Sequence, residues 1–90
     1  MHRHPRIVRV GKRQVRILRA LQELDRELTI QGVALAIGMT EQDSHNLRSP
    51  LAGLEIMQLI MSKEHGEKHA RRMFSLTEKG RNLLQGLEAE

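Results

Sequence analysis

Side chains with hydrogen-bonding groups are concentrated in the middle of this 90-residue chain. They are Ser44, His45, Asn46, Arg48 and Ser49. An arginine can donate two hydrogen bonds to guanine, and an asparagine can make a two-point contact with adenine. On the exposed face of one helix, this set could therefore contact base edges in the major groove of duplex DNA. The alternative is an ordinary solvated helix face, which also carries polar residues.

Basic residues are gathered in two places where they could contact phosphate. Residues 1–19 hold seven lysines and arginines and no acidic residue, whereas residues 20–90 hold eight basic and eleven acidic residues. The candidate phosphate contacts are Arg3, Arg6, Arg9, Lys12 and Arg13 near the N-terminus, and Lys63, Lys68, Arg71 and Arg72 in a later predicted hairpin. Such concentrated positive charge attracts polyanions such as nucleic acid or acidic lipid. For residues 1–10 the alternatives are a solvated tail and packing on a partner subunit.

Little in the sequence supports disulfides, metal binding or catalysis. The chain has no cysteine, which excludes disulfides, thiolate metal sites and cysteine nucleophiles. His65 and His69 are four residues apart, but Gly66 between them opposes the helical face that a metal site with this spacing needs. No glycine-rich phosphate loop, nucleophile elbow or other catalytic motif occurs. We therefore expect a protein that is not an enzyme and has no cofactor or metal.

Apolar stretches are short and periodic. None approaches the ~20 residues needed to cross a bilayer, so we expect a cytoplasmic protein without membrane contact. The predicted elements are helices at about 12–27, 30–37, 43–58 and from 78 onward, and strands at 59–63 and 70–76. Thr29 and Thr77 are the predicted N-caps of the second and last helices, and Gly38 ends the second. These elements make residues 1–10 a basic arm and residues 11–90 one mainly α domain with a small β-hairpin.

Pro50 interrupts the apolar stripe of the third predicted helix. The stripe consists of Leu47, Leu51, Leu54 and Gln58. A proline in a helix interior costs ~3 kcal/mol, whereas in the first turn its missing N–H has no intrahelical partner to lose. We predict one continuous helix capped by Asp43 and kinked at Pro50. The alternative is a separate turn at 45–48 followed by a helix that Ser49 caps.

The order helix, helix, helix, hairpin, helix resembles that of the winged helix-turn-helix repressors, and the MarR-like branch most closely. The stretch "NLRSPLAGLEIMQLI" resembles the recognition helix of that group, and "RRMFSLTEKGRNLL" is similar to its second wing strand and the helix that follows. With "LTIQGVALAIGMT", the resemblance covers about residues 28–84, and the second stretch is the most specific. It implies a three-helix core with a wing and a C-terminal helix.

The same resemblance implies a small transcriptional regulator. Such a protein would bind double-stranded DNA as a homodimer, with the recognition helix in the major groove and the basic wing and arm on the backbone. The alternative is a winged-helix module for protein–protein assembly, which the outward position of Ile56 and the acidic Glu41 and Asp43 would favour.

The chain departs from the family pattern in three places. The segment from Thr40 to Leu47 is longer than usual, and Gln58-Leu59 stands where a Gly-Leu pair is expected before the wing. The chain is also shorter than typical members, without the extra helices that usually build a dimer interface and a ligand pocket. This weakens the expectation of a small-molecule effector more than that of DNA binding.

Overall fold

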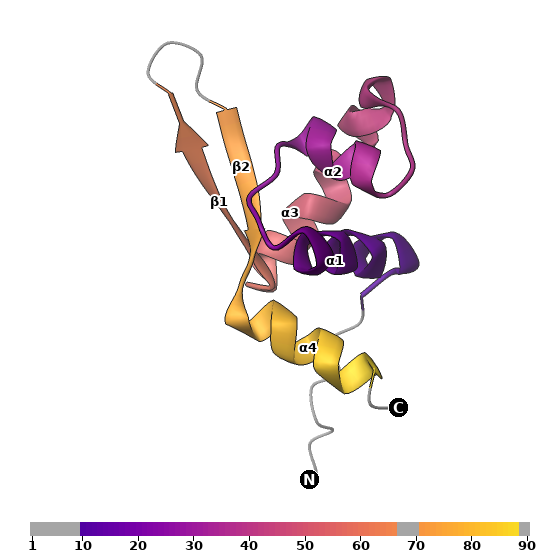
Figure 1. Ribbon diagram of the computed structural model, residues 1–90, viewed down its shortest axis with the longest axis vertical. Helices are drawn as coiled ribbons and strands as arrows, with labels where there is room; N and C mark the ends of the chain where they lie inside the picture. Colours follow the sequence, from indigo (N-terminus) through magenta and orange to yellow (C-terminus); the bar gives the residue numbers. More distant parts are fainter. Residues whose placement is uncertain (1–9, 67–70, 89–90) are drawn as a thin grey trace, which may run out of the picture.

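The computed structural model describes residues 10–66 and 71–88. The elements are α1 (Lys12–Leu24), α2 (Ile30–Ala36), the 3-10 helix η1 (Glu41–Leu47), α3 (Arg48–Ile56), β1 (Ile60–His65), β2 (Arg71–Leu76) and α4 (Glu78–Glu88). Figure 1 shows β1 and β2 as a hairpin projecting beside the helices, with α4 beyond the base of β2. The mainly α fold with a small antiparallel hairpin is therefore as predicted. The proposed arm, apart from its last residue, lies outside the described residues.

One hydrophobic core joins all of these elements. Its members with 2% or less of their surface exposed are Ile17, Leu18, Leu21, Val33, Ala34, Leu47, Leu51, Leu54, Leu59, Ile60 and Leu84. α1, α2 and α3 contribute residues spaced three or four apart, so burial of one face holds each of these helices against the others. The leucine stripe predicted for the third helix is thus confirmed at three of its four positions.

The first helix ends earlier than predicted. Its last residue is Leu24, and Asp25 follows with a left-handed φ of 49°. Leu28 then pairs with Phe74 of β2 through two backbone hydrogen bonds of 2.9 and 2.7 Å. Leu24 and Leu28 share helical spacing, but Leu24 is 48% exposed and Leu28 is buried against the hairpin. A tertiary contact therefore overrides the periodicity of this segment.

The prediction of a continuous α-helix with Pro50 in its interior is wrong. η1 begins after Thr40, and the α-helix begins only at Arg48, although the backbone stays right-handed through Leu47 and Arg48. Pro50 is therefore the third residue of α3, in a first turn where a missing N–H is tolerated. Neither Asp43 nor Ser49 is the N-cap. The polar residues before Leu47 belong to η1, which accounts for the unusual length of the segment from Thr40 to Leu47.

The end of α3 also differs from the prediction. The helix stops at Ile56, and Gln58 has a φ of 63° with an exposed side chain, so it does not extend the inward stripe. Leu59, 1% exposed, takes the buried position instead. The strands begin at Ile60 and Arg71, close to the predicted starts, and pair from Ile60 with Leu76 to His65 with Arg71.

Predicted capping residues are confirmed in two helices. The Thr29 hydroxyl accepts a hydrogen bond from the Gly32 N–H at 3.1 Å, and Gly38 follows α2 with a φ of 87°. The Thr77 hydroxyl accepts from the Gly80 N–H at 3.0 Å. These bonds satisfy N–H groups that the first turn of a helix leaves without partners.

Candidate nucleic-acid interface

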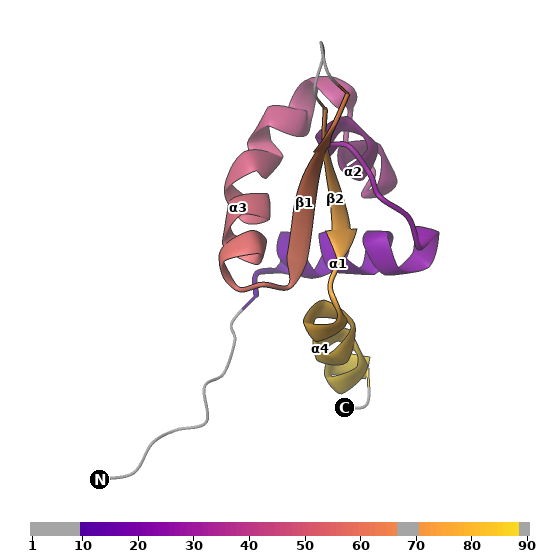
Figure 2. The same ribbon diagram turned by 90° about the vertical axis from the view of Figure 1, so that its left-hand side faces the viewer.

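α2, η1 and α3 form two helical segments joined by a tight turn, with the η1–α3 segment presenting one face outward. Figure 1 and Figure 2 together show α2 and α3 on the same side of the hairpin, with α3 running alongside β1. Exposed on η1 and α3 are His45, Asn46, Arg48 and Ser49. Ser44 is 8% exposed, so its side chain is not available on this face. Four of the five residues suggested for base contact are thus accessible together.

His45 is held in a defined orientation at the start of this face. Its Nδ1 lies 2.8 Å from the carbonyl oxygen of Gln42. A carbonyl only accepts, so Nδ1 carries the proton and Nε2 of a neutral ring is left as an acceptor. An acceptor here suits the exocyclic amino groups of adenine or cytosine in the major groove.

Small residues allow α3 to approach neighbouring surfaces closely. Ala52 is exposed on the outer face, and Gly53 packs against α1, where an added Cβ would lie 2.9 Å from Gln14 Nε2. The same Gln14 amide donates to the Pro50 carbonyl at 3.2 Å, and its Oε1 accepts from the Gly11 N–H at 2.8 Å. Gln14 therefore ties the start of α1 to the first turn of α3.

Lys12 and Arg13 precede this contact and are exposed. The tie through Gln14 brings the basic start of α1 to the side of α3. Of the other basic residues proposed for the N-terminal segment, Arg3, Arg6 and Arg9 lie outside the described residues.

The hairpin carries its basic residues on exposed positions. Lys63, Arg71 and Arg72 are all exposed, and Lys68 lies outside the described residues. Arg72 is paired across the strands with Glu64, with 3.4 Å between Arg72 Nη2 and Glu64 Oε1. Both side chains are more than half exposed, so the pair is worth at most ~1 kcal/mol and phosphate can compete for the guanidinium.

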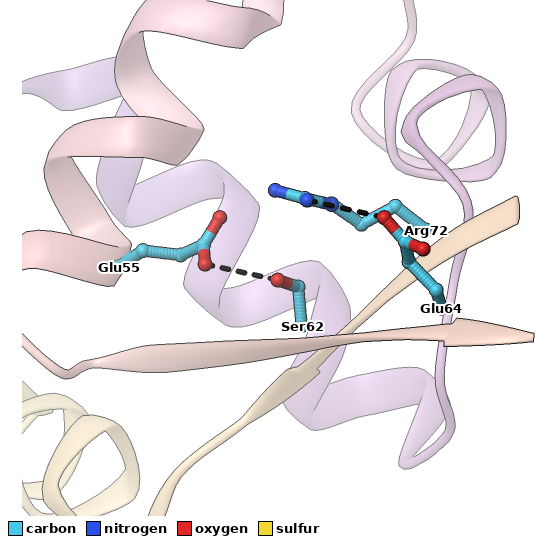
Figure 3. Close-up of polar contacts among 4 residues, drawn as sticks. All are labelled: Glu55, Ser62, Glu64 and Arg72. Carbon is cyan, nitrogen blue, oxygen red and sulfur yellow. Dashed lines mark hydrogen bonds and ion pairs between the residues drawn. The ribbon is translucent and has the colours of Figure 1, made fainter.

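A hydrogen bond attaches the hairpin to α3. The Ser62 hydroxyl donates to Glu55 Oε2 at 2.9 Å, as Figure 3 shows beside the Glu64–Arg72 pair. The bond is partly buried, which shields it from competing water. α3 and β1 are therefore coupled, so that their exposed groups keep one relative position.

Between α2, α3 and β2 lies an open groove of about 930 Å³. Its charged lining consists of Arg48, Arg71, Arg72, Glu41 and Glu55, above an apolar floor that includes Leu51 and Phe74. The three arginines outnumber the two carboxylates, so the groove between α3 and the hairpin has a net positive charge. We call it the wing groove.

Sequence reasoning missed Gln14, Glu55, Ser62 and Glu64 as residues that position the candidate contacts. Each of these residues contacts a residue of another helix or strand. Its partner could therefore be identified only once the strand register and the positions of the helices were known. Glu64 had a usable signal, since an acid in one strand and an arginine in the next form a cross-strand pair when they are opposite each other.

Asp43 serves the turn before α3. The Thr40 hydroxyl donates to Asp43 Oδ2 at 2.6 Å, and the Asp43 N–H donates to the Thr40 carbonyl at 3.1 Å. The hydroxyl bond in particular lowers the pKa of Asp43 below its ordinary value. Asp43 is therefore a turn-stabilising carboxylate and not the predicted N-cap of the third helix.

Residues 10–66 and 71–88 contain no group of three or more His, Cys, Asp or Glu side chains placed to hold a metal ion. Of the helices in these two ranges, none is both long enough and apolar enough to span a bilayer.

Neither a protein-family model nor a curated protein matches the chain. Solved structures are similar to the chain. The crystal structure of the A103V mutant of MepR from a multidrug-resistant Staphylococcus aureus clinical isolate is similar with a TM-score of 0.71 and 23% identity. MepR itself, a transcription regulator of the S. aureus multidrug efflux pump MepA, is similar with a TM-score of 0.64 and 22% identity.

In both comparisons the match covers 89% of this chain and 56% of the MepR chain, so the present chain spans little more than half of that protein's length. The likeness establishes the fold. The winged helix-turn-helix architecture implied by the MarR-like resemblance is confirmed, with η1–α3 in the recognition-helix position and β1–β2 as the wing.

Proposed function

We propose that this protein binds double-stranded DNA in a sequence-specific manner and acts as a small transcriptional regulator. The observation that carries the proposal is the joining of two contact surfaces by the Ser62–Glu55 hydrogen bond. One is the exposed polar face of η1–α3, and the other is the basic wing. A single rigid unit can thus contact base edges and phosphates at once.

The roles of the individual side chains follow from their chemistry. Arg48 can donate to guanine O6 and N7, Asn46 can pair with adenine, and His45 and Ser49 can make single hydrogen bonds to base edges. These residues supply sequence discrimination.

Phosphate contacts come from the wing and from the start of the chain. On the wing they are Lys63, Arg71 and Arg72, joined by Lys68 beyond the described residues. Near the start of the chain, the proposed phosphate contacts are Lys12 and Arg13, together with Arg3, Arg6 and Arg9 of the arm. They supply affinity and orientation, and little sequence information.

We expect the protein to act as a homodimer. Two copies would present two recognition helices to half-sites about one helical turn apart, ~34–36 Å. The structural neighbour MepR is described as a regulator of an efflux pump; for the present chain we propose no regulated gene and no effector.

The test is selection of bound DNA from a pool of random duplexes by the whole 90-residue chain. We expect enrichment of one sequence, and an affinity that falls linearly with the logarithm of salt concentration. The absence of enrichment together with absent or salt-insensitive binding would contradict the proposal.

One observation favours a second candidate, a winged-helix module for protein–protein assembly. Ile56 is 82% exposed on α3, and an exposed apolar residue can mark a protein contact. Under this alternative, Ile56→Ser would abolish self-association or partner binding, and the selection would enrich no sequence.

A further inference from the structure

The outer face of α3 ends in one large apolar side chain. Ile56 is 82% exposed, the highest value among the large hydrophobic residues in the described part of the chain. Ser49 and Ala52 precede it by seven and four residues and are also exposed, so the three lie on the same side of the helix. Along its length this face changes from small and polar to branched and apolar.

The packing of the domain gives no reason for an isoleucine at this position. The core contacts of α3 come from Leu51 and Leu54, which are 2% and 0% exposed on the opposite side. A branched side chain that stays in water gains almost nothing from burial and is a weaker helix former than alanine. A binding partner, by contrast, would bury it.

We propose that Ile56 contacts the C5 methyl group of a thymine and is a specificity-determining residue of the recognition helix; this inference rests on the proposed binding of duplex DNA. Of the base-edge groups in the major groove, the thymine methyl is the one that suits apolar contact. Ser49 and Ala52 are small enough to let α3 lie close to the bases. Ala52 of this face also lines the wing groove, whose three arginines outnumber its two carboxylates and favour a polyanion over an apolar protein surface.

Helix geometry sets where the thymine lies in the binding site. Ile56 follows Arg48 by eight residues, which is ~12 Å along the axis of α3. Base pairs are stacked about 3.4 Å apart. The thymine is therefore expected about three to four base pairs from the pair that Arg48 contacts.

Replacement of thymine by deoxyuridine tests this contact directly, because it removes only the methyl group. Each thymine of the selected duplex is replaced in turn, and the affinity of the whole chain is measured. We expect one position at which binding weakens about three- to fivefold, the value of one methyl-sized apolar contact. Ile56→Ala should bind the thymine and deoxyuridine duplexes equally well.

Two further variants serve as controls. Leu24→Ala shortens another exposed apolar side chain, 48% exposed at the end of α1, and should keep the full preference for thymine. Ile56→Val keeps a branched side chain and should keep part of the preference. Because Ile56 is exposed, its variants should unfold at nearly the wild-type temperature. If Ile56→Ala does not unfold near that temperature, the preference for thymine is measured with Ile56→Val instead.

Three results would overturn the inference. In the first, no thymine is sensitive to loss of its methyl while duplex binding persists, which leaves the proposed function intact. In the second, Ile56→Ala retains the thymine preference. In the third, Ile56→Ala changes self-association and leaves DNA affinity unchanged, which assigns the residue to a protein interface. Absence of duplex binding by the wild type contradicts the proposed function as well.

Discussion

The hydroxyl of Thr77 donates a hydrogen bond to the carbonyl oxygen of Gln58 at 2.7 Å. The Thr77 hydroxyl oxygen also accepts a hydrogen bond from the Gly80 N–H at 3.0 Å, so one side chain caps α4 and binds the turn that ends α3. Lys79 adds a second link, with its Nζ 3.0 Å from the Met57 carbonyl oxygen. The "LTEKGR" stretch that suggested the fold therefore connects the start of α4 to the end of α3.

Gly80→Ala should destabilise the protein by about 1–3 kcal/mol. A Cβ at this position would lie 2.3 Å from the Leu59 carbonyl oxygen and 2.7 Å from Leu76 Cδ1, so α4 would have to move away from the wing base. The matched control is Gly86→Ala in the same helix, where an added Cβ meets nothing within 4 Å. That change should stabilise by about 0.5–1 kcal/mol through helix propensity. Thermal or urea unfolding measures both, and equal effects would contradict the close packing at Gly80.

Gln58→Gly should stabilise the protein by about 0.5–1 kcal/mol. Gln58 has a φ of 63°, a left-handed conformation that strains any side chain with a Cβ and that glycine adopts without cost. Gln58→Ala keeps the Cβ and should give no such gain. The free energy of unfolding in urea distinguishes the two, and similar values for glycine and alanine would show that backbone strain is not the cause.

Arg48→Ala and Lys63→Ala should weaken DNA binding in different ways. Loss of Arg48 should cost about 1–3 kcal/mol on the selected site and relax the preference at one base pair, with a much smaller effect on random duplex. Loss of Lys63 should weaken binding to all duplexes alike and reduce the salt slope by about one. Binding titrations at several salt concentrations measure both. If Arg48→Ala weakens binding to all duplexes alike, Arg48 contacts phosphate and not a base edge.

Glu64→Gln should strengthen binding to random duplex about two- to fivefold. The substitution releases Arg72 from its 3.4 Å ion pair and removes a carboxylate that repels phosphate. Glu23→Gln removes the same charge from an exposed position on α1 and serves as the control. If both variants gain equally, net charge rather than the release of Arg72 is responsible.

The carboxyl of Asp43 should titrate below the ordinary aspartate range. Because its folded-state pKa is lowered, mainly by the Thr40 hydroxyl, its contribution to stability is present above the unfolded pKa and is lost as pH falls through the folded value. An NMR titration of the side-chain carboxyl measures the midpoint. Thr40→Ala should raise it toward the ordinary value and Thr40→Ser should not. A midpoint unaffected by Thr40→Ala would show that the hydroxyl bond is not the cause.

Local signals were sufficient for most of the fold. Thr29, Gly38 and Thr77 act through neighbours within one turn, so their types alone predicted where helices begin or end. The leucine stripe of the third helix was equally readable, because burial of one face imposes a period. Local patterns of this kind were enough to predict the order of helices and hairpin without any knowledge of tertiary contacts.

The errors have tertiary causes. Leu28 leaves the helical pattern because it pairs with Phe74, and Gln58 turns outward because Thr77 binds its carbonyl. In the candidate site, the helical period of the leucines was enough to predict that Ser49 faces outward with Arg48 beside it, whereas Ser44 lies in the 3-10 helix η1, where that period does not apply. The Ser62–Glu55 and Glu64–Arg72 contacts needed the strand register.

The pairing of Leu28 with Phe74 has a consequence for self-assembly. β2 is paired with β1 on one side and, at Phe74, with Leu28 on the other, so the edge of the wing without any such backbone pairing is that of β1. In residues 10–66 and 71–88, no further strand covers that edge. Its outer half carries the exposed charged residues Lys63 and Glu64, and charges on an open edge oppose the addition of a strand from another molecule. Lys63, which we propose to contact phosphate, thus also helps to protect the protein from edge-to-edge aggregation.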